Sequence, residues 1–161
     1  MNIQTLGALA ALALLAACSS EDKMMTTGAT GGAAAPAPAM GIVPGSEEDL
    51  KANVGDRVFF DFDKSGLKDE GKGTLDRQSA WLAKYAQVSV QIAGNCDERG
   101  TEEYNIALGE RRASAARDYL VAKGVATARI TTISYGKDRP IAPGSTEEAW
   151  AQNRNAITSV R

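Results

Sequence analysis

Residues 88–124 read VSVQIAGNCDERGTEEYNIALGERRASAARDYLVAKG, and this stretch decides the fold. Its first six residues alternate between apolar and polar side chains, which predicts a strand. A polar loop bounded by glycines follows. The remainder predicts a helix with Thr101 as its N-cap, two glutamates in its first turn and Gly124 as its stop. The stretch is therefore a strand, a loop and a helix in succession.

The flanking sequence predicts three more strands and two more helices. In the first strand Val58, Phe60 and Phe62 alternate with charged residues, with Phe59 as the exception, so we expect a strand buried chiefly on one face. The added strands are expected at 57–63, 129–135 and 155–160, and the added helices at 69–87 and 146–153. The order β-α-β-α-β-α-β predicts one α/β domain of the α+β type, a mixed sheet with helices packed on one or both faces.

The composition excludes several classes of function. The chain has no histidine, which excludes Ser-His and Cys-His dyads, histidine-ligated zinc and a histidine pH switch. Its 18 Lys and Arg against 20 Asp and Glu give a formal charge of −2 without a basic patch, so we expect no nucleic-acid partner. We also predict no cofactor, no metal ion and no catalytic residue.

The first residues predict an export signal. The apolar run over 6–15 is too short to span a bilayer but has the length of a signal-peptide core. LAAC at 15–18 follows it and resembles the lipobox of bacterial lipoproteins, in which the cysteine is lipidated and becomes the mature N-terminus. The alternative is an ordinary secretory signal in which Cys18 is incidental. Cys96 is the one other cysteine, so acylation of Cys18 would leave no intrachain disulfide.

The domain organisation follows from these changes in composition. We expect a signal peptide over 1–17, then a lipidated N-terminus and flexible linker over 18–45, rich in Gly, Ala and Pro. A single domain is expected over 46–161.

A buried charge is predicted on the helix that follows Thr101. At 100° per residue its apolar stripe consists of Tyr104, Leu108, Ala115, Tyr119 and Ala122. Arg112 falls inside this stripe. Because a guanidinium stays charged and is rarely desolvated without a partner, Arg112 needs a carboxylate from the protein or from a ligand. Alternatively, its stem covers the core and its head reaches water.

Acidic residues follow two of the predicted strands. Asp61 and Asp63 end the first strand, and Asp97 lies in the loop after the second. Since α/β folds commonly place ligand sites past the carboxyl ends of strands, Asp97 and Arg112 could form the two poles of a receptor for a zwitterion. Asp97 would take an ammonium and Arg112 a carboxylate. The alternative is that these acids are ordinary solvated loop residues.

Four motifs then lead to a family. They are FDFDKS at 60–65, NCDERGTEEYN at 95–105, LGERRA at 108–113 and SYGKDRP at 134–140. Together they resemble the OmpA-like domain family, and the resemblance covers residues 55–161. It implies an OmpA-like domain that binds peptidoglycan, the bacterial cell wall, through the diaminopimelate of its peptide stem without cleaving it.

The resemblance also implies site residues, position by position. Asp97 matches the aspartate that meets the ammonium of diaminopimelate, and Arg112 the arginine that meets its carboxylate. Arg154 matches an arginine near the rim of the pocket. Three further positions that line or shape the pocket are Asp63, Asn105 and Leu108.

The sequence departs from the family's pattern at three places. Asn95 and Cys96 stand where the family often has a histidine and then a small residue or threonine. Asn155 stands where a second arginine is usual, and Asp63 offers a carboxylate where some relatives have an amide. Cys96 would leave a free thiol beside the pocket.

The resemblance finally implies a place in the cell. It implies an outer-membrane lipoprotein, anchored by acyl chains on Cys18, whose domain faces the periplasm and works with TolB and other Tol proteins in envelope integrity and cell division. Ser19, where an aspartate is absent, goes with delivery to the outer membrane. One rival is a periplasmic peptidoglycan hydrolase, since an Asp/Glu pair can cleave a glycoside without histidine. Another is a stator-type motor anchor, against which the lipobox counts.

Overall fold

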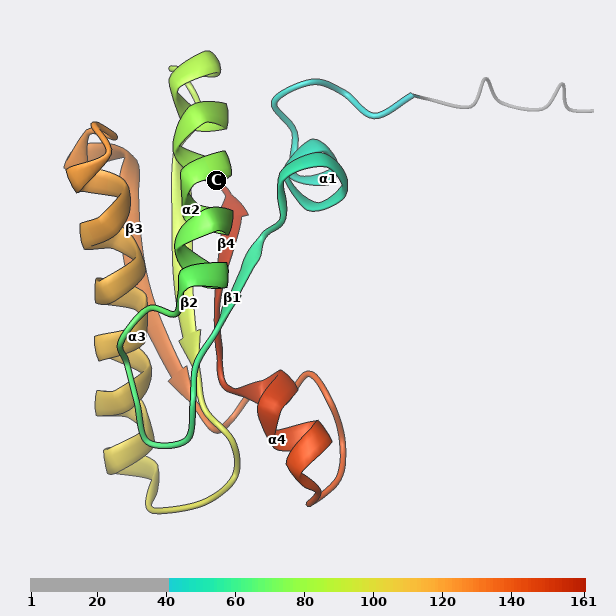
Figure 1. Ribbon diagram of the computed structural model, residues 1–161, viewed down its shortest axis with the longest axis vertical. Coiled ribbons are helices and arrows are strands. Elements are labelled where there is room, and N and C mark those ends of the chain that lie inside the picture. Colours follow the sequence, from blue (N-terminus) through green and yellow to red (C-terminus); the bar gives the residue numbers. More distant parts are fainter. Residues whose placement is uncertain (1–40) are drawn as a thin grey trace, which may run out of the picture. The chain divides into compact units, whose positions relative to one another are not determined.

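The computed structural model describes residues 41–161. The predicted signal peptide, the lipidation site at Cys18 and most of the linker lie outside the described residues. In chain order (Figure 1) the elements are α1 (Glu47–Asp49), a π-helical turn η1 (Leu50–Val54), β1 (Arg57–Phe59), α2 (Asp69–Lys84), β2 (Val90–Asn95), α3 (Glu102–Ala122), a 3-10 turn η2 (Thr127–Arg129), β3 (Ile130–Gly136), α4 (Glu147–Asn153) and β4 (Asn155–Val160). Within this described part, no helix is both long enough and apolar enough to cross a membrane.

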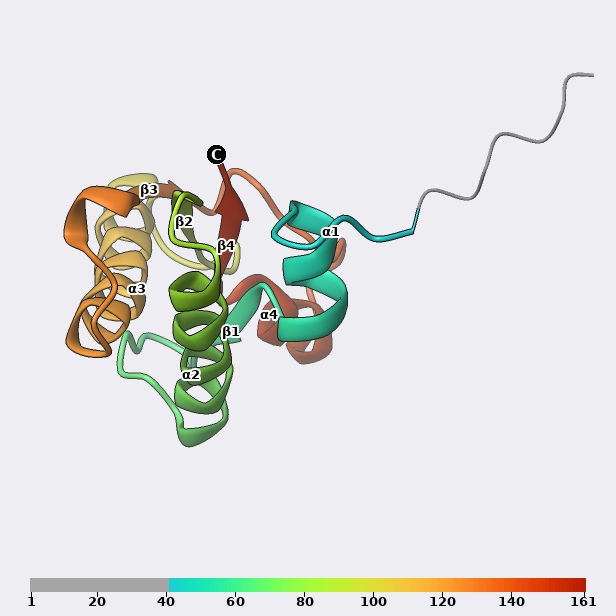
Figure 2. The same ribbon diagram turned by 90° about the horizontal axis from the view of Figure 1, so that it is seen from above.

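The four strands form one mixed sheet in the order β1-β4-β2-β3. β2 and β3 are parallel, and β4 runs antiparallel to both of its neighbours, β1 and β2. α2 and α3 lie side by side on one face of the sheet, as Figures 1 and 2 both show. The predicted mixed α/β fold is confirmed. The short helical segment over α1 and η1 is an addition that the sequence patterns did not indicate.

The core lies between the sheet and this pair of helices. Val90 and Ile92 of β2 belong to one buried cluster with Leu75 and Leu82 of α2 and Leu120 of α3. All five are fully buried. The burial of one face of β2 explains why apolar and polar residues alternate along this strand, since its other side chains point away from the helices.

β1 is shorter than the sequence predicts. It ends at Phe59, whereas the alternation predicted a strand over 57–63. Val58 and Phe60 are buried as expected, but Phe62 is 56% exposed. The reason is that the chain leaves the sheet after Phe60, whose backbone N–H still donates to the Arg154 carbonyl. The next residues form a loop beside the start of α3.

The buried face of α3 is turned by about 90° from the predicted stripe. Tyr104 is 46% exposed, and the buried positions are Asn105, Leu108, Gly109, Arg112, Ala113, Ala116 and Leu120. The cause is a close approach of backbones. A Cβ built on Gly94 of β2 would lie 1.8 Å from the Gly109 carbonyl oxygen, so both positions require glycine for this packing. Small residues therefore face the sheet, and the tyrosines lie at the flank.

The Asp49 carboxylate helps to fasten the N-terminal helical segment to α2. Asp49 accepts hydrogen bonds from the Gly45 backbone N–H at 2.8 Å, from Asn53 Nδ2 at 2.8 Å and from Trp81 Nε1 at 2.9 Å. Led by the bond from Gly45, these contacts lower the pKa of Asp49 to about 2. Asp49 therefore stays ionised and fixes the point at which the chain enters the domain.

Candidate functional site

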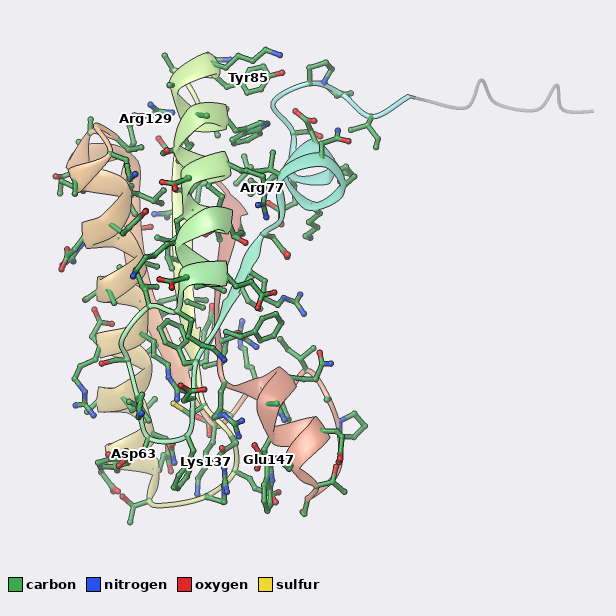
Figure 3. All side chains as sticks on the ribbon, in the orientation of Figure 1. Asp63, Arg77, Tyr85, Arg129, Lys137 and Glu147 are labelled. Atoms are coloured by element: carbon green, nitrogen blue, oxygen red, sulfur yellow. The ribbon has the colours of Figure 1, made fainter. Side chains whose placement is uncertain are left out.

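The candidate site lies where β2 ends and α3 begins. In Figure 3, Asp63, Lys137 and Glu147 mark this end of the domain, and Tyr85 and Arg129 the opposite end. The loop between β2 and α3 folds back onto the helix, because Asn105 Nδ2 donates to the carbonyls of Arg99 at 2.8 Å and Thr101 at 2.9 Å. This folding brings Asp97 to the helix face that carries Arg112.

A cavity of about 160 Å³ opens at this point. Five of the six residues expected to form the ligand site line it together: Asp63, Asp97, Asn105, Leu108 and Arg112. The other lining residues are Phe62, Cys96, Arg99, Gly100 and Tyr104. Thr101 is the N-cap of α3, as predicted, and its side chain accepts from the Tyr104 N–H.

Arg112 forms one wall of the cavity and is 1% exposed. Its guanidinium donates to three backbone carbonyls: from Nε to Lys64 at 2.9 Å, from Nη1 to Asn95 at 2.8 Å and from Nη2 to Asp61 at 3.1 Å. The sequence led us to expect a carboxylate partner, and in the described residues carbonyl oxygens take that place. Burial lowers the pKa of Arg112, but a guanidinium remains charged in proteins.

Asp97 faces the same cavity and is 4% exposed. Burial raises its pKa, but hydrogen bonds from the Arg99 side chain and backbone and from Arg154 outweigh burial and hold the pKa of Asp97 below its ordinary value. Within the described part no ion pair joins Asp97 to Arg112, so the cavity contains an acid and a base that are held apart.

Arg99 is the residue that sequence reasoning missed. Its Nη2 lies 2.6 Å from Asp97 Oδ2, and its guanidinium carbon lies 4.0 Å from the ring centres of both Phe62 and Trp150. The neighbouring acid at position 97 was the one signal in the sequence. The two rings come from the loop after β1 and from α4, so no local pattern could have indicated the stack.

The remaining predicted residues are placed as follows. Asp63 is exposed, has a left-handed backbone conformation with φ of 56° and accepts a hydrogen bond from the Tyr104 hydroxyl. Leu108 is buried and gives the cavity an apolar wall. Arg154, which was expected near the rim, is 6% exposed and does not itself line the cavity. It reaches the site through Asp97, at 3.3 Å.

Two of the departures from the family's pattern contact each other. Asn95 Nδ2 donates to Asn155 Oδ1 at 2.8 Å, in the sheet interior beneath the site. Cys96 is 3% exposed, and its thiol donates to the Asn105 carbonyl at 3.4 Å. Burial raises the pKa of Cys96, so the thiol is neutral.

This arrangement favours binding over catalysis. A glycoside hydrolase needs one carboxyl whose pKa is raised so that it can act as an acid. The pKa of Asp97 is lowered, and hydrogen bonds from Ser145 and Trp150 lower that of Glu98. Within residues 41–161 no three potential ligands form a metal-binding group. The cavity can instead hold a ligand that carries both charges.

Comparison with known proteins agrees with the fold. The OmpA family model matches residues 59–154, and the chain belongs to the OmpA family. The homologues of this chain in that family are binding proteins and not enzymes. Its relatives carry a more particular name, peptidoglycan-associated lipoprotein. One from Mesorhizobium japonicum is 46% identical over 95% of this chain and 89% of its own, and one from Pseudomonas aeruginosa is 44% identical over 96% of each. The crystal structure of the peptidoglycan-associated lipoprotein from Burkholderia pseudomallei matches with a TM-score of 0.64 at 42% identity, over 66% of this chain and 90% of that one.

Proposed function

We propose that this protein binds peptidoglycan non-covalently and holds the diaminopimelate of a peptide stem in the cavity between Asp97 and Arg112. Asp97 takes the side-chain ammonium of diaminopimelate, and Arg112 takes the carboxylate on the same carbon. The observation that carries the proposal is one small cavity lined by an acid and a base that do not pair with each other. The name of the relatives, peptidoglycan-associated lipoprotein, supports it.

The donor count at Arg112 leaves room for this ligand. A guanidinium has five N–H donors, and three of them have carbonyl partners among the described residues. The two that remain suit a carboxylate, which accepts from a guanidinium through two oxygens. Asn105 and Leu108 complete the wall on the α3 side, and Asp63 lies on the opposite loop.

The test is sedimentation of the purified protein with cell wall of three kinds. Wall containing diaminopimelate should bind, and free diaminopimelate should compete. A lysine-type wall or a wall amidated at that carboxylate should bind at least ten-fold more weakly, which is about 1.4 kcal/mol. The reason is that a site built around a charged group rejects analogues that lack it. Equal binding to the three walls would contradict the zwitterion mechanism.

A matched pair of variants tests the acidic pole. Asp97→Asn removes the charge but keeps the shape, and a loss of about 2–5 kcal/mol is expected, as for partners of buried charged contacts. Asp118→Asn makes the same change at an exposed residue of α3 that pairs with Arg117, and should leave sedimentation unchanged. Arg112→Ala is a poor probe, because it also removes three bonds that hold the loops together.

We further propose that the protein tethers the outer membrane to the wall through acyl chains on Cys18, and that it works with TolB and other Tol proteins in envelope integrity and cell division. The lipobox-like LAAC at 15–18 and the word lipoprotein in the names of the relatives support the anchor. Mass spectrometry of the native N-terminus should find an acylated Cys18. An unmodified cysteine, or an N-terminus that retains residues 1–17, would contradict it. TolB should co-purify with the native protein from detergent-solubilised envelopes.

A further inference from the structure

Donors of the protein take all the acceptor positions of Asp97. A carboxylate offers about four lone-pair sites. Its Oδ1 accepts from the backbone N–H and from Nε of Arg99, both at 3.2 Å. Its Oδ2 accepts from Arg99 Nη2 at 2.6 Å and from Arg154 Nη1 at 3.3 Å. A ligand ammonium can therefore reach Asp97 only when one of these four donors leaves.

The donor that can leave is the side chain of Arg99. The Arg154 side chain is 7% exposed and is held at two further points, by the Phe60 carbonyl at 3.1 Å and by Glu147 Oε1 at 2.6 Å. The Arg99 side chain is 31% exposed and lines the cavity. Its backbone N–H is fixed by the loop, so the guanidinium is the exchangeable contact.

A second carboxylate lies near the Arg99 guanidinium and could receive it. The group lies between the rings of Phe62 and Trp150, each centred 4.0 Å away, and such stacking favours a cation wherever it lies over the ring faces. Its Nη1 is 4.0 Å from Glu147 Oε2 at the start of α4. A small movement between the two rings would exchange one carboxylate, Asp97, for another, Glu147.

We propose that Arg99 is an exchangeable counter-ion of Asp97. Before a ligand binds, its guanidinium neutralises the buried carboxylate. A ligand ammonium replaces it, and Arg99 moves toward Glu147 while it stays between the two rings. The inference rests on the proposed function, because diaminopimelate supplies the ammonium. It makes Arg99 a specificity-determining residue, since a ligand without a cation cannot break the Arg99–Asp97 pair.

The test is calorimetric titration of the full-length protein with the purified stem tripeptide that ends in diaminopimelate. Removing the internal competitor by Arg99→Gln should tighten binding at least three-fold. Arg117→Gln removes an equal charge from an exposed pair on α3 and should have no effect. Glu147→Gln should weaken binding more in the wild-type background than in the Arg99→Gln background, because the bond from Arg154 to Glu147 is weakened in both and only the wild type has an Arg99 for Glu147 to receive.

The outcomes separate this inference from the proposed function. If Arg99→Gln binds the tripeptide as the wild type does, or more weakly, the exchange is refuted and the proposed function stands. If the wild type binds neither the tripeptide nor sedimented wall, both are refuted. Arg99→Lys is a second variant should Arg99→Gln fail to fold. Lysine keeps the charge but loses the two-nitrogen grip on Asp97, so it should also bind more tightly than the wild type.

Discussion

Replacing Gly94 with alanine should destabilise the domain far more than a methyl group ordinarily does. The new Cβ would lie 1.8 Å from the carbonyl oxygen of Gly109, 2.6 Å from its carbonyl carbon and 3.0 Å from its Cα. All three atoms belong to the backbone of α3, so no side chain can rotate away. Restoring an ordinary contact requires α3 to retreat from β2 by about 1.6 Å.

That retreat also breaks a contact of the binding site. The bond from Arg112 Nη1 to the Asn95 carbonyl is 2.8 Å long and joins the same two elements. A shift of this size takes it beyond hydrogen-bond range. Overpacking costs about 1–3 kcal/mol, and a lost bond to a charged group about 1.5–3 kcal/mol. The sum predicts a loss of about 2.5–6 kcal/mol for Gly94→Ala, together with weaker wall binding.

Urea unfolding of the two purified proteins measures this loss as a change in midpoint at a constant slope. Gly66→Ala is the matched control, because a Cβ there meets nothing within 4 Å, and its effect should stay within about 0.5 kcal/mol. A Gly94→Ala protein within about 1 kcal/mol of the wild type would refute the claim that this contact fixes α3.

Three further predictions concern single side chains. Arg112→Lys keeps the charge but cannot serve three carbonyls on separate segments, so urea unfolding should show a loss of about 2–4 kcal/mol. The pKa of Asp49 is about 2 in the folded protein and near 3.8 in the unfolded chain, so the stabilising contribution of Asp49 is complete above about pH 4 and is lost as the pH falls toward 2. The free energy of unfolding, measured between about pH 6 and pH 2, should therefore decrease less steeply in Asp49→Asn than in the wild type. Because Cys96 is buried and its pKa is raised, iodoacetamide should label the Cys96 peptide slowly in native protein and quickly in urea, as peptide mass spectrometry would show, and equal rates would contradict its burial.

Local signals in the sequence predicted the elements well. The ends of α3 follow from Thr101, whose hydroxyl caps the helix, and from Gly124, whose φ of 98° suits glycine. The bounds of α4 and β4 were equally predictable. Each of these features depends on residues close together in the sequence, so the local sequence is sufficient to predict it.

The errors arose where distant segments meet. The rotation of α3 depends on the approach of Gly109 to Gly94, which no helical period can indicate. Phe62 extends an alternating pattern, but its ring serves the stack around Arg99. A hydrophobic pattern predicts that an aromatic ring will be packed, but it does not indicate whether the ring packs in the core or against a cation. Part of the site was therefore visible from the sequence, and its charge network was not.

The charge network involves two arginines with different roles, whereas the sequence indicated Arg112 alone. Arg112 joins the loop after β1, through the Asp61 and Lys64 carbonyls, to the end of β2, through Asn95. It therefore builds the cavity as well as facing it. Every substitution at Arg112 changes both the fold and the ligand contact, and a loss of binding there cannot distinguish the two. The Arg99 side chain contacts Asp97 and the rings of Phe62 and Trp150 and donates to none of these carbonyls, so variants at Arg99 report on recognition more directly than variants at Arg112 do.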